Sequence, residues 1–167
     1  MGMLSFIKDA GQKLFGIGEA HAAAAAVAAA PTEENIKAMS DAAGDSIATY
    51  IGEMGLSVTG LTVAFDAPSG VASVYGIAAD QETKEKVVLC CGNVSGVASV
   101  NDQMSVDQSS DESQYYTVVS GDNLSKISKE YYDTPNKYMA IFEANQPMLT
   151  GPDKIYPGQV LRIPAEA

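Results

Sequence analysis

Residues 115–131 read YYTVVSGDNLSKISKEY and combine a short extended run with the start of a helix. The β-branched and aromatic side chains of residues 115–119 favour a strand, and Asp122 can cap the helix that follows. Apolar side chains then recur at helical spacing: Leu124, Ile127 and Tyr131. A second helix is expected around residues 137–145, and Pro157-Gly158 turns the chain into a last strand. This part therefore predicts a small β-α-α-β domain.

The middle of the chain predicts a different order: helix, strand, strand, helix, strand. Thr32 can cap the first helix and Asp80 the second. Between these helices, alternating apolar residues on both sides of the turn at 66–70 indicate a hairpin. Gly92 stands where a helix commonly ends in the left-handed conformation, and a final strand is expected over 97–106. The whole chain is therefore predicted to be α+β, with two small domains.

Composition also suggests where the domains begin and end. Residues 1–18 carry apolar side chains at helical spacing and predict a short N-terminal helical segment, whereas the alanine-rich residues 19–31 predict a linker. Residues 108–114 are polar without a large apolar side chain, which is typical of a second linker. The two domains are then expected at 32–107 and 115–167.

Charge and hydropathy disfavour several kinds of partner. The 167-residue chain has 21 acidic and 10 basic residues and a net charge of -11. Nucleic acids and anionic membrane surfaces attract Lys and Arg, so neither is expected as a partner. No window reaches the roughly 18 apolar residues that span a bilayer, and charged residues interrupt the apolar run at the N-terminus, unlike an export signal. We expect a cytoplasmic monomer.

Enzyme chemistry finds little support in the residue types. The only histidine is His21, in the alanine tract, so a Ser-His-Asp or Cys-His arrangement would depend on a residue in a linker. Cys90 and Cys91 are adjacent and, with one histidine, do not give zinc-site spacing. We expect these cysteines to be small helix residues, one facing the core and the other partly exposed. The sequence therefore favours a binding protein over an enzyme.

The C-terminal part closely resembles a LysM domain. The matching positions are Tyr116, Val118, Gly121, Asp122, Leu124, Ile127, Tyr132, Ile141, Ala144, Asn145, Ile155, Pro157, Gly158, Gln159, Leu161, Ile163 and Pro164. Ser128 and Asp133 depart from the pattern, where Ala and Gly are usual. LysM domains mostly bind N-acetylglucosamine polymers, so this resemblance implies a peptidoglycan-binding protein of the cell envelope as an alternative function. The glycan groove would lie between the loops 121–124 and 146–149.

The middle part resembles a BON domain, another α+β module. Gly70-Val71, Val74-Tyr75-Gly76 and residues 96–102 stand where that family has its hairpin glycines and its closing strand. Together with residues 1–15, the arrangement is similar to the bacterial BON–LysM potassium-binding family over nearly the whole chain. This resemblance implies a cytoplasmic potassium sensor or buffer.

A potassium site need not leave a side-chain motif, because neutral backbone carbonyls can replace the hydration shell of K⁺. Residues 91–97 follow a helix C-terminus, whose last carbonyls lack helix partners and carry partial negative charge, and glycines let the backbone turn these oxygens inward. Residues 9–12 offer a second turn of this kind. Without the resemblance, a helix cap and a loop are the simpler interpretation of both segments.

The resemblance implies one potassium ion held by six backbone carbonyls. The ligand residues would be Ile7, Ala10, Gln12, Gly92, Val94 and Val97. Gln12 stands where relatives are expected to have an acidic residue, but a carbonyl ligand does not depend on its side chain. Rubidium or cesium should substitute, whereas sodium is too small to reach all the oxygens. Ion binding would order residues 1–18 and shift the balance between open and closed forms.

Overall fold

The computed structural model describes residues 3–5, 29, 32–94 and 96–165. The elements in chain order are β1 (Met3–Ser5), α3 (Glu33–Glu53), β2 (Val58–Asp66), β3 (Val71–Asp80), α4 (Gln81–Gly92), β4 (Ser99–Asp102), β5 (Ser105–Gln108), β6 (Gln114–Thr117), α5 (Leu124–Tyr132), the 3-10 helix η1 (Pro135–Lys137), α6 (Tyr138–Ala144) and β7 (Val160–Ile163). Helices and strands are mixed along the chain, and the strands form two separate sheets. The predicted α+β class is confirmed.

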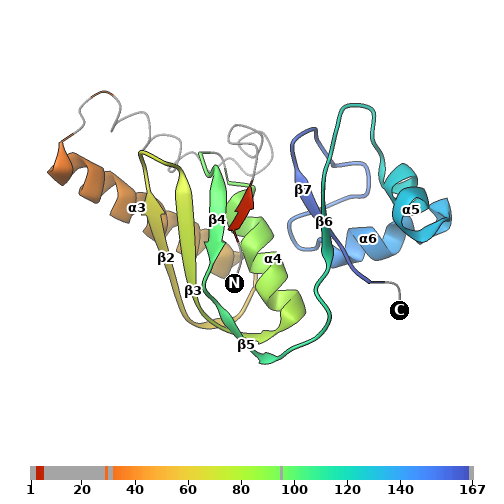
Figure 1. Ribbon diagram of the computed structural model, residues 1–167, viewed down its shortest axis with the longest axis horizontal. Coiled ribbons are helices and arrows are strands. Elements are labelled where there is room, and N and C mark those ends of the chain that lie inside the picture. Colours follow the sequence, from red (N-terminus) through yellow and green to blue (C-terminus); the bar gives the residue numbers. More distant parts are fainter. Residues whose placement is uncertain (1–2, 6–28, 30–31, 95, 166–167) are drawn as a thin grey trace.

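The first sheet forms the N-terminal unit, which comprises β1 to β5 with α3 and α4 (Figure 1). β3 pairs antiparallel with β2 and parallel with both β4 and β5, and β1 pairs antiparallel with β4. The buried faces of α3 and α4 pack on one side of this sheet, over Val63, Phe65, Ala72, Val74 and Val100. This packing forms the larger of the two apolar cores.

Both predicted helix caps of the N-terminal unit are present. The Asn35 N–H donates to Thr32 Oγ1 over 3.2 Å, and the Thr83 N–H donates to Asp80 Oδ1 over 2.7 Å. α3 also approaches β2 closely at Gly44, where an added Cβ would lie 2.5 Å from the Val63 carbonyl oxygen. A glycine is therefore required at the contact between α3 and the sheet.

The structure corrects three local expectations in the N-terminal unit. Met3–Ser5 form strand β1 rather than part of a helix, because pairing with β4 satisfies backbone groups along the edge of the sheet. The strand expected over 97–106 is divided into β4 and β5, and between them the Gln103 N–H bonds to the Val74 carbonyl. Gly92 is the last residue of α4, and the positive φ of 95° occurs at Gly96.

The second sheet forms the C-terminal unit, which comprises β6, α5, η1, α6 and β7. β6 and β7 are antiparallel, with Tyr116 opposite Leu161. The cap of α5 is Asn123 rather than Asp122, since the Lys126 N–H donates to Asn123 Oδ1. The Asp122 carboxylate accepts hydrogen bonds from the Tyr116 hydroxyl and the Val119 N–H. The core of this unit consists of Val118, Leu124, Ile127, Tyr132, Ile141, Leu149, Leu161 and Ile163.

α4 lies between the first sheet and β7, so both of its sides are covered (Figure 1). All four residues of β7 are buried: Leu161 and Ile163 belong to the C-terminal core, whereas Val160 belongs to the apolar cluster of the N-terminal unit. Cys90 and Cys91 are each 0% exposed. The expectation that one of these cysteines is partly exposed is wrong, because the C-terminal unit covers the second side of the helix.

Candidate functional site

Residues 92–97, which comprise the last residue of α4 and the turn that follows it and are called here the loop after α4, contain three of the six predicted ligand residues. Three backbone hydrogen bonds among the described residues shape its turn: Asn93 N–H to Leu89 O (2.9 Å), Val94 N–H to Cys91 O (3.2 Å) and Val97 N–H to Val94 O (3.2 Å). The Val94 carbonyl is therefore an acceptor within the turn. The carbonyls of Gly92 and Val97 are not acceptors in these three bonds.

Burial and the helix dipole make this loop favourable for a cation. Val94 and Val97 are 1% and 0% exposed, and Gly92 and Asn93 are also buried. The C-terminus of a helix carries partial negative charge, and the last turn of α4 contains no basic residue that would offset it. Buried carbonyl groups need partners, and a bound cation can supply one.

The β2–β3 turn holds the loop from one side. The Ala98 N–H donates to the Gly70 carbonyl over 2.8 Å. A Cβ at Gly70 would lie 3.0 Å from the Gly96 carbonyl oxygen, and both glycines have positive φ, at 73° and 95°. The close approach of the two backbones therefore favours glycine at position 70, and the positive φ favours glycine at both positions.

Asn93 holds the loop from the other side, through the C-terminal unit. Asn93 Nδ2 donates to the Val160 carbonyl over 3.1 Å, and the Val160 N–H donates to Asn93 Oδ1 over 3.2 Å. Sequence reasoning missed this residue. Its partner lies 67 residues further along the chain and contributes only backbone atoms, so no local pattern indicates the contact.

The other three predicted ligand residues, Ile7, Ala10 and Gln12, lie outside the described residues. Strand β1 nevertheless shows where this part of the chain begins. β1 ends at Ser5, which pairs with Ser99, two residues after Val97. The first strand therefore ends beside the exit of the loop that carries Gly92, Val94 and Val97.

A buried polar cluster joins α4 to β7 and was also missed by sequence reasoning. Arg162 Nε donates to Glu85 Oε2 over 2.8 Å, and the two residues are 6% and 2% exposed. Gln81 Nε2 and the Ser113 N–H both donate to Glu85 Oε1. Burial alone would raise the pKa of Glu85, but the hydrogen bonds from Ser113, Gln81 and Arg162 together lower it. This carboxylate is therefore ionised and fully bonded in the interface between the two units.

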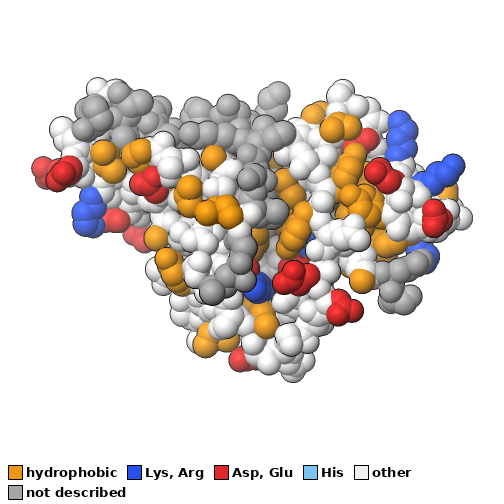
Figure 2. All heavy atoms as spheres, in the orientation of Figure 1, with side chains coloured by type: hydrophobic (Ala, Val, Ile, Leu, Met, Phe, Trp, Pro, Cys, Tyr) orange, Lys and Arg blue, Asp and Glu red, His pale blue; other side chains and the backbone are white. Residues whose placement is uncertain are grey.

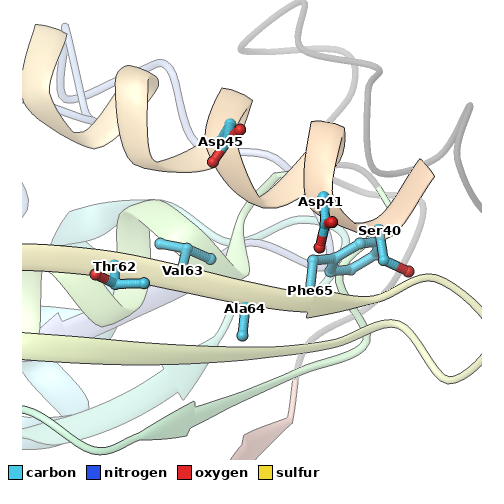
Figure 3. A pocket seen from close by; sticks show the side chains of 7 residues that line it. All are labelled: Ser40, Asp41, Asp45, Thr62, Val63, Ala64 and Phe65. Atoms are coloured by element: carbon cyan, nitrogen blue, oxygen red, sulfur yellow. The ribbon is translucent and has the colours of Figure 1, made fainter. Parts of the chain in front are cut away.

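A groove of about 430 Å³ lies between α3 and β2 (Figure 3). Asp41 and Asp45 of α3 line it together with residues 62–65 of β2, and Asp41 is paired with Lys37. The three predicted ligand residues that the structure describes, Gly92, Val94 and Val97, do not line this groove. Figure 2 shows acidic side chains spread over both units on the face in view. Among the described residues, no three or more His, Cys, Asp or Glu side chains are grouped to hold a metal.

Comparison with known proteins agrees with this architecture. The LysM domain family matches residues 116–164, which confirms the resemblance of the C-terminal unit. The chain is 43% identical over 166 residues to the potassium binding protein Kbp of Escherichia coli O6:H1 strain CFT073, covering 99% of this chain and 100% of that protein. The chain belongs to the Kbp family. The LysM domain of this chain is thus the unit that contains β6 and β7.

A second relative matches only part of this chain. An uncharacterised protein of Deinococcus radiodurans is 49% identical over 49 residues, which is 29% of this chain and 19% of that protein.

No helix in the described part of the chain is long and apolar enough to cross a membrane.

Proposed function

We propose that this chain is a cytoplasmic potassium-binding protein that acts by binding rather than catalysis and changes conformation when K⁺ binds. The observation that carries the proposal is the buried loop at the C-terminus of α4, beside which β1 ends. Membership of the Kbp family supports the choice of ion, because the E. coli relative is named a potassium binding protein.

The ligands in this proposal are backbone carbonyl oxygens from two segments. Gly92, Val94 and Val97 contribute from the loop after α4, and Ile7, Ala10 and Gln12 contribute from the N-terminal segment. The Val94 carbonyl accepts the Val97 N–H at 3.2 Å, but a carbonyl oxygen has two lone pairs and can also face an ion. Neutral carbonyl oxygens suit K⁺ because they replace its weakly held water.

Such a site would join residues 1–18 to the predicted BON domain at 32–107. An ion that bridges two segments favours the form in which both sets of carbonyls meet, so K⁺ would shift the chain toward that closed form. A ligand that binds only the folded state and is present at about 100 times its dissociation constant stabilises that state against unfolding by about 2.7 kcal/mol. We therefore expect the thermal midpoint to rise with K⁺ concentration.

The two-segment site is tested by comparing two variants in a calorimetric titration with KCl. Deleting residues 1–13 removes three of the six carbonyls together with the edge strand β1, and it should abolish the binding heat while both domains stay folded by circular dichroism. Gln12→Ala is the matched control, because it keeps the backbone carbonyl and should bind K⁺ like the unmodified chain. If the deletion variant binds K⁺ with unchanged affinity, the ligands do not come from the N-terminal segment.

A second candidate function is peptidoglycan binding, and the LysM match over residues 116–164 is the observation that favours it. The expected groove lies between the loops 121–124 and 146–149. Met148 and Leu149 are 3% and 1% exposed, and Met148 packs into the apolar cluster of the N-terminal unit. One wall of the groove is thus covered by the protein itself, and we propose that glycan contact is weak.

The glycan proposal is tested by sedimentation with purified peptidoglycan. We expect the protein to stay in the supernatant, since the Met148 side of the groove is buried. Tight co-sedimentation that is lost in Asn123→Ala would instead make the LysM domain a glycan receptor.

A further inference from the structure

The free edge of β7 is closed by two asparagine side chains. The N–H and C=O groups of Arg162 bond to Asn145, over 2.8 and 2.9 Å, within the LysM domain. The same two groups of Val160 bond to Asn93 of the N-terminal unit, over 3.2 and 3.1 Å. Each amide satisfies one donor and one acceptor of the strand, as a neighbouring strand would. The two asparagines together therefore act as a partial third strand.

The positions of these two asparagines give them different consequences. Asn145 follows α6 and fixes β7 inside its own domain. Asn93 lies in the chain between Gly92 and Val94, two of the proposed ligand residues, and it is itself 4% exposed. Its side chain therefore connects the proposed carbonyl ligands directly to the LysM domain.

We propose that Asn93 is a positioning residue for the cation site, which it sets by anchoring the loop after α4 to the backbone of Val160. This inference rests on the proposed function, because it assigns a role at the same site. Asn93 does not contact the ion in this proposal. It acts by fixing the peptide groups on either side of it, so that the neighbouring carbonyls are already oriented when the ion arrives.

Other contacts across the interface are less suited to this role. The Glu85–Arg162 pair lies eight residues earlier on α4, which corresponds to about 12 Å along the helix. It orients the helix and the LysM domain relative to each other, but it does not restrain the loop directly. The bond from Ala98 to Gly70 restrains the far end of the loop, within the N-terminal unit. Asn93 thus restrains the loop at the end nearest the helix terminus.

Coupling of this kind acts in both directions. If the Asn93–Val160 bonds strengthen cation binding, cation binding must strengthen those bonds by the same factor. Coupling between two sites typically changes affinity about 5–150-fold, and we expect loss of both bonds to weaken the K⁺ affinity about tenfold, at the low end of that range.

The first test is a calorimetric K⁺ titration of full-length Asn93→Ala. Asn136→Ala is the matched control, since Asn136 is an exposed asparagine on η1. We expect about tenfold weaker K⁺ binding in Asn93→Ala and unchanged affinity in Asn136→Ala. A lower melting temperature with unchanged K⁺ affinity would show that Asn93 has only a structural role and would overturn the inference while the proposed function stands. Absence of K⁺ binding in the unmodified chain would overturn both.

A second test needs no variant and holds even if Asn93→Ala fails to fold. Amide hydrogen exchange is measured in the unmodified protein with KCl and with an equal concentration of NaCl. The Val160 N–H, bonded to Asn93, should exchange about tenfold more slowly with K⁺. The Arg162 N–H, bonded to Asn145 within the LysM domain, is the internal control and should change much less. Equal slowing at both amides, or at neither, would contradict a role for Asn93 in transmitting ion binding.

Discussion

Replacing Arg162 by Met removes the positive charge from a buried ion pair between the two units while keeping most of the side-chain volume. Glu85 would stay ionised at 2% exposure, with only the Gln81 and Ser113 donors left to it. Removing one partner of a buried pair costs about 3–5 kcal/mol, and the two donors that stay place this variant near 3 kcal/mol. For a chain of this length, the melting temperature should fall by about 6–12 °C.

The assay is reversible urea unfolding of Arg162→Met, followed by circular dichroism at neutral pH. The double variant Glu85→Gln/Arg162→Met removes both charges and should recover most of the lost stability. Lys37→Met is the matched control, since it breaks an exposed pair with Asp41 and should leave the unfolding curve unchanged. A single variant within about 1 kcal/mol of the unmodified chain would refute the view that this pair is a buried, ionised interface contact.

Three further predictions concern the pH dependence, the thiols and the packing of α3. The pKa of Glu85 is lowered in the folded protein, so the ionised carboxylate stabilises the fold fully above the ordinary pKa of 4.5. This stabilisation is lost as the pH falls through the folded pKa. In urea titrations at acid pH, the stability advantage of the unmodified chain over Glu85→Gln should therefore disappear. Burial raises the pKa of Cys90 to about 12, and it raises the pKa of Cys91 as well. Neither thiol should therefore react with iodoacetamide at neutral pH until urea unfolds the chain. Rapid labelling of the native protein would show that α4 is not covered. Gly44→Ala places a Cβ 2.5 Å from the Val63 carbonyl oxygen, and it should destabilise the chain by about 1–3 kcal/mol in the same urea assay. A neutral effect would mean that α3 can move away from β2.

The local parts of the fold could be predicted because their causes are local. The caps at Thr32 and Asp80 each accept a hydrogen bond from the residue three positions later, and the sequence contains both partners side by side. The C-terminal domain was also predictable, because a LysM domain has many marked positions within a short stretch. Its exact cap was not, because Asp122 and Asn123 are both good capping residues, and the Asp122 carboxylate is instead engaged by the Tyr116 hydroxyl and the Val119 N–H.

The interface between the two units could not be predicted. Glu85 and Arg162 are separated by 77 residues, and nothing in the sequence around either residue indicates the other. The burial of Cys90 and Cys91 follows from the same interface and was missed for the same reason. Strand β1 is only three residues long, and its pairing with β4 outweighs a weak helical pattern.

The candidate ion site is hard to find from residue types because its ligands are backbone oxygens. Gly92 and Gly96 mark a helix end and a tight turn, which occur in many proteins without an ion. The predicted set of six residues came from the family resemblance, and the described half of it lies in one buried loop. Asn93, between two members of that set, was identifiable only from its contact with Val160.

The most direct test of potassium binding is a calorimetric titration of the full-length chain with KCl, RbCl and NaCl, each at the same total ionic strength. The proposed carbonyl site predicts saturable binding of one K⁺ per chain, substitution by Rb⁺, and little or no heat from Na⁺, which is too small to reach all the oxygens. An equal response to Na⁺ and K⁺, or heat that never saturates, would instead reflect general screening of a chain with net charge -11 and would contradict a selective potassium site.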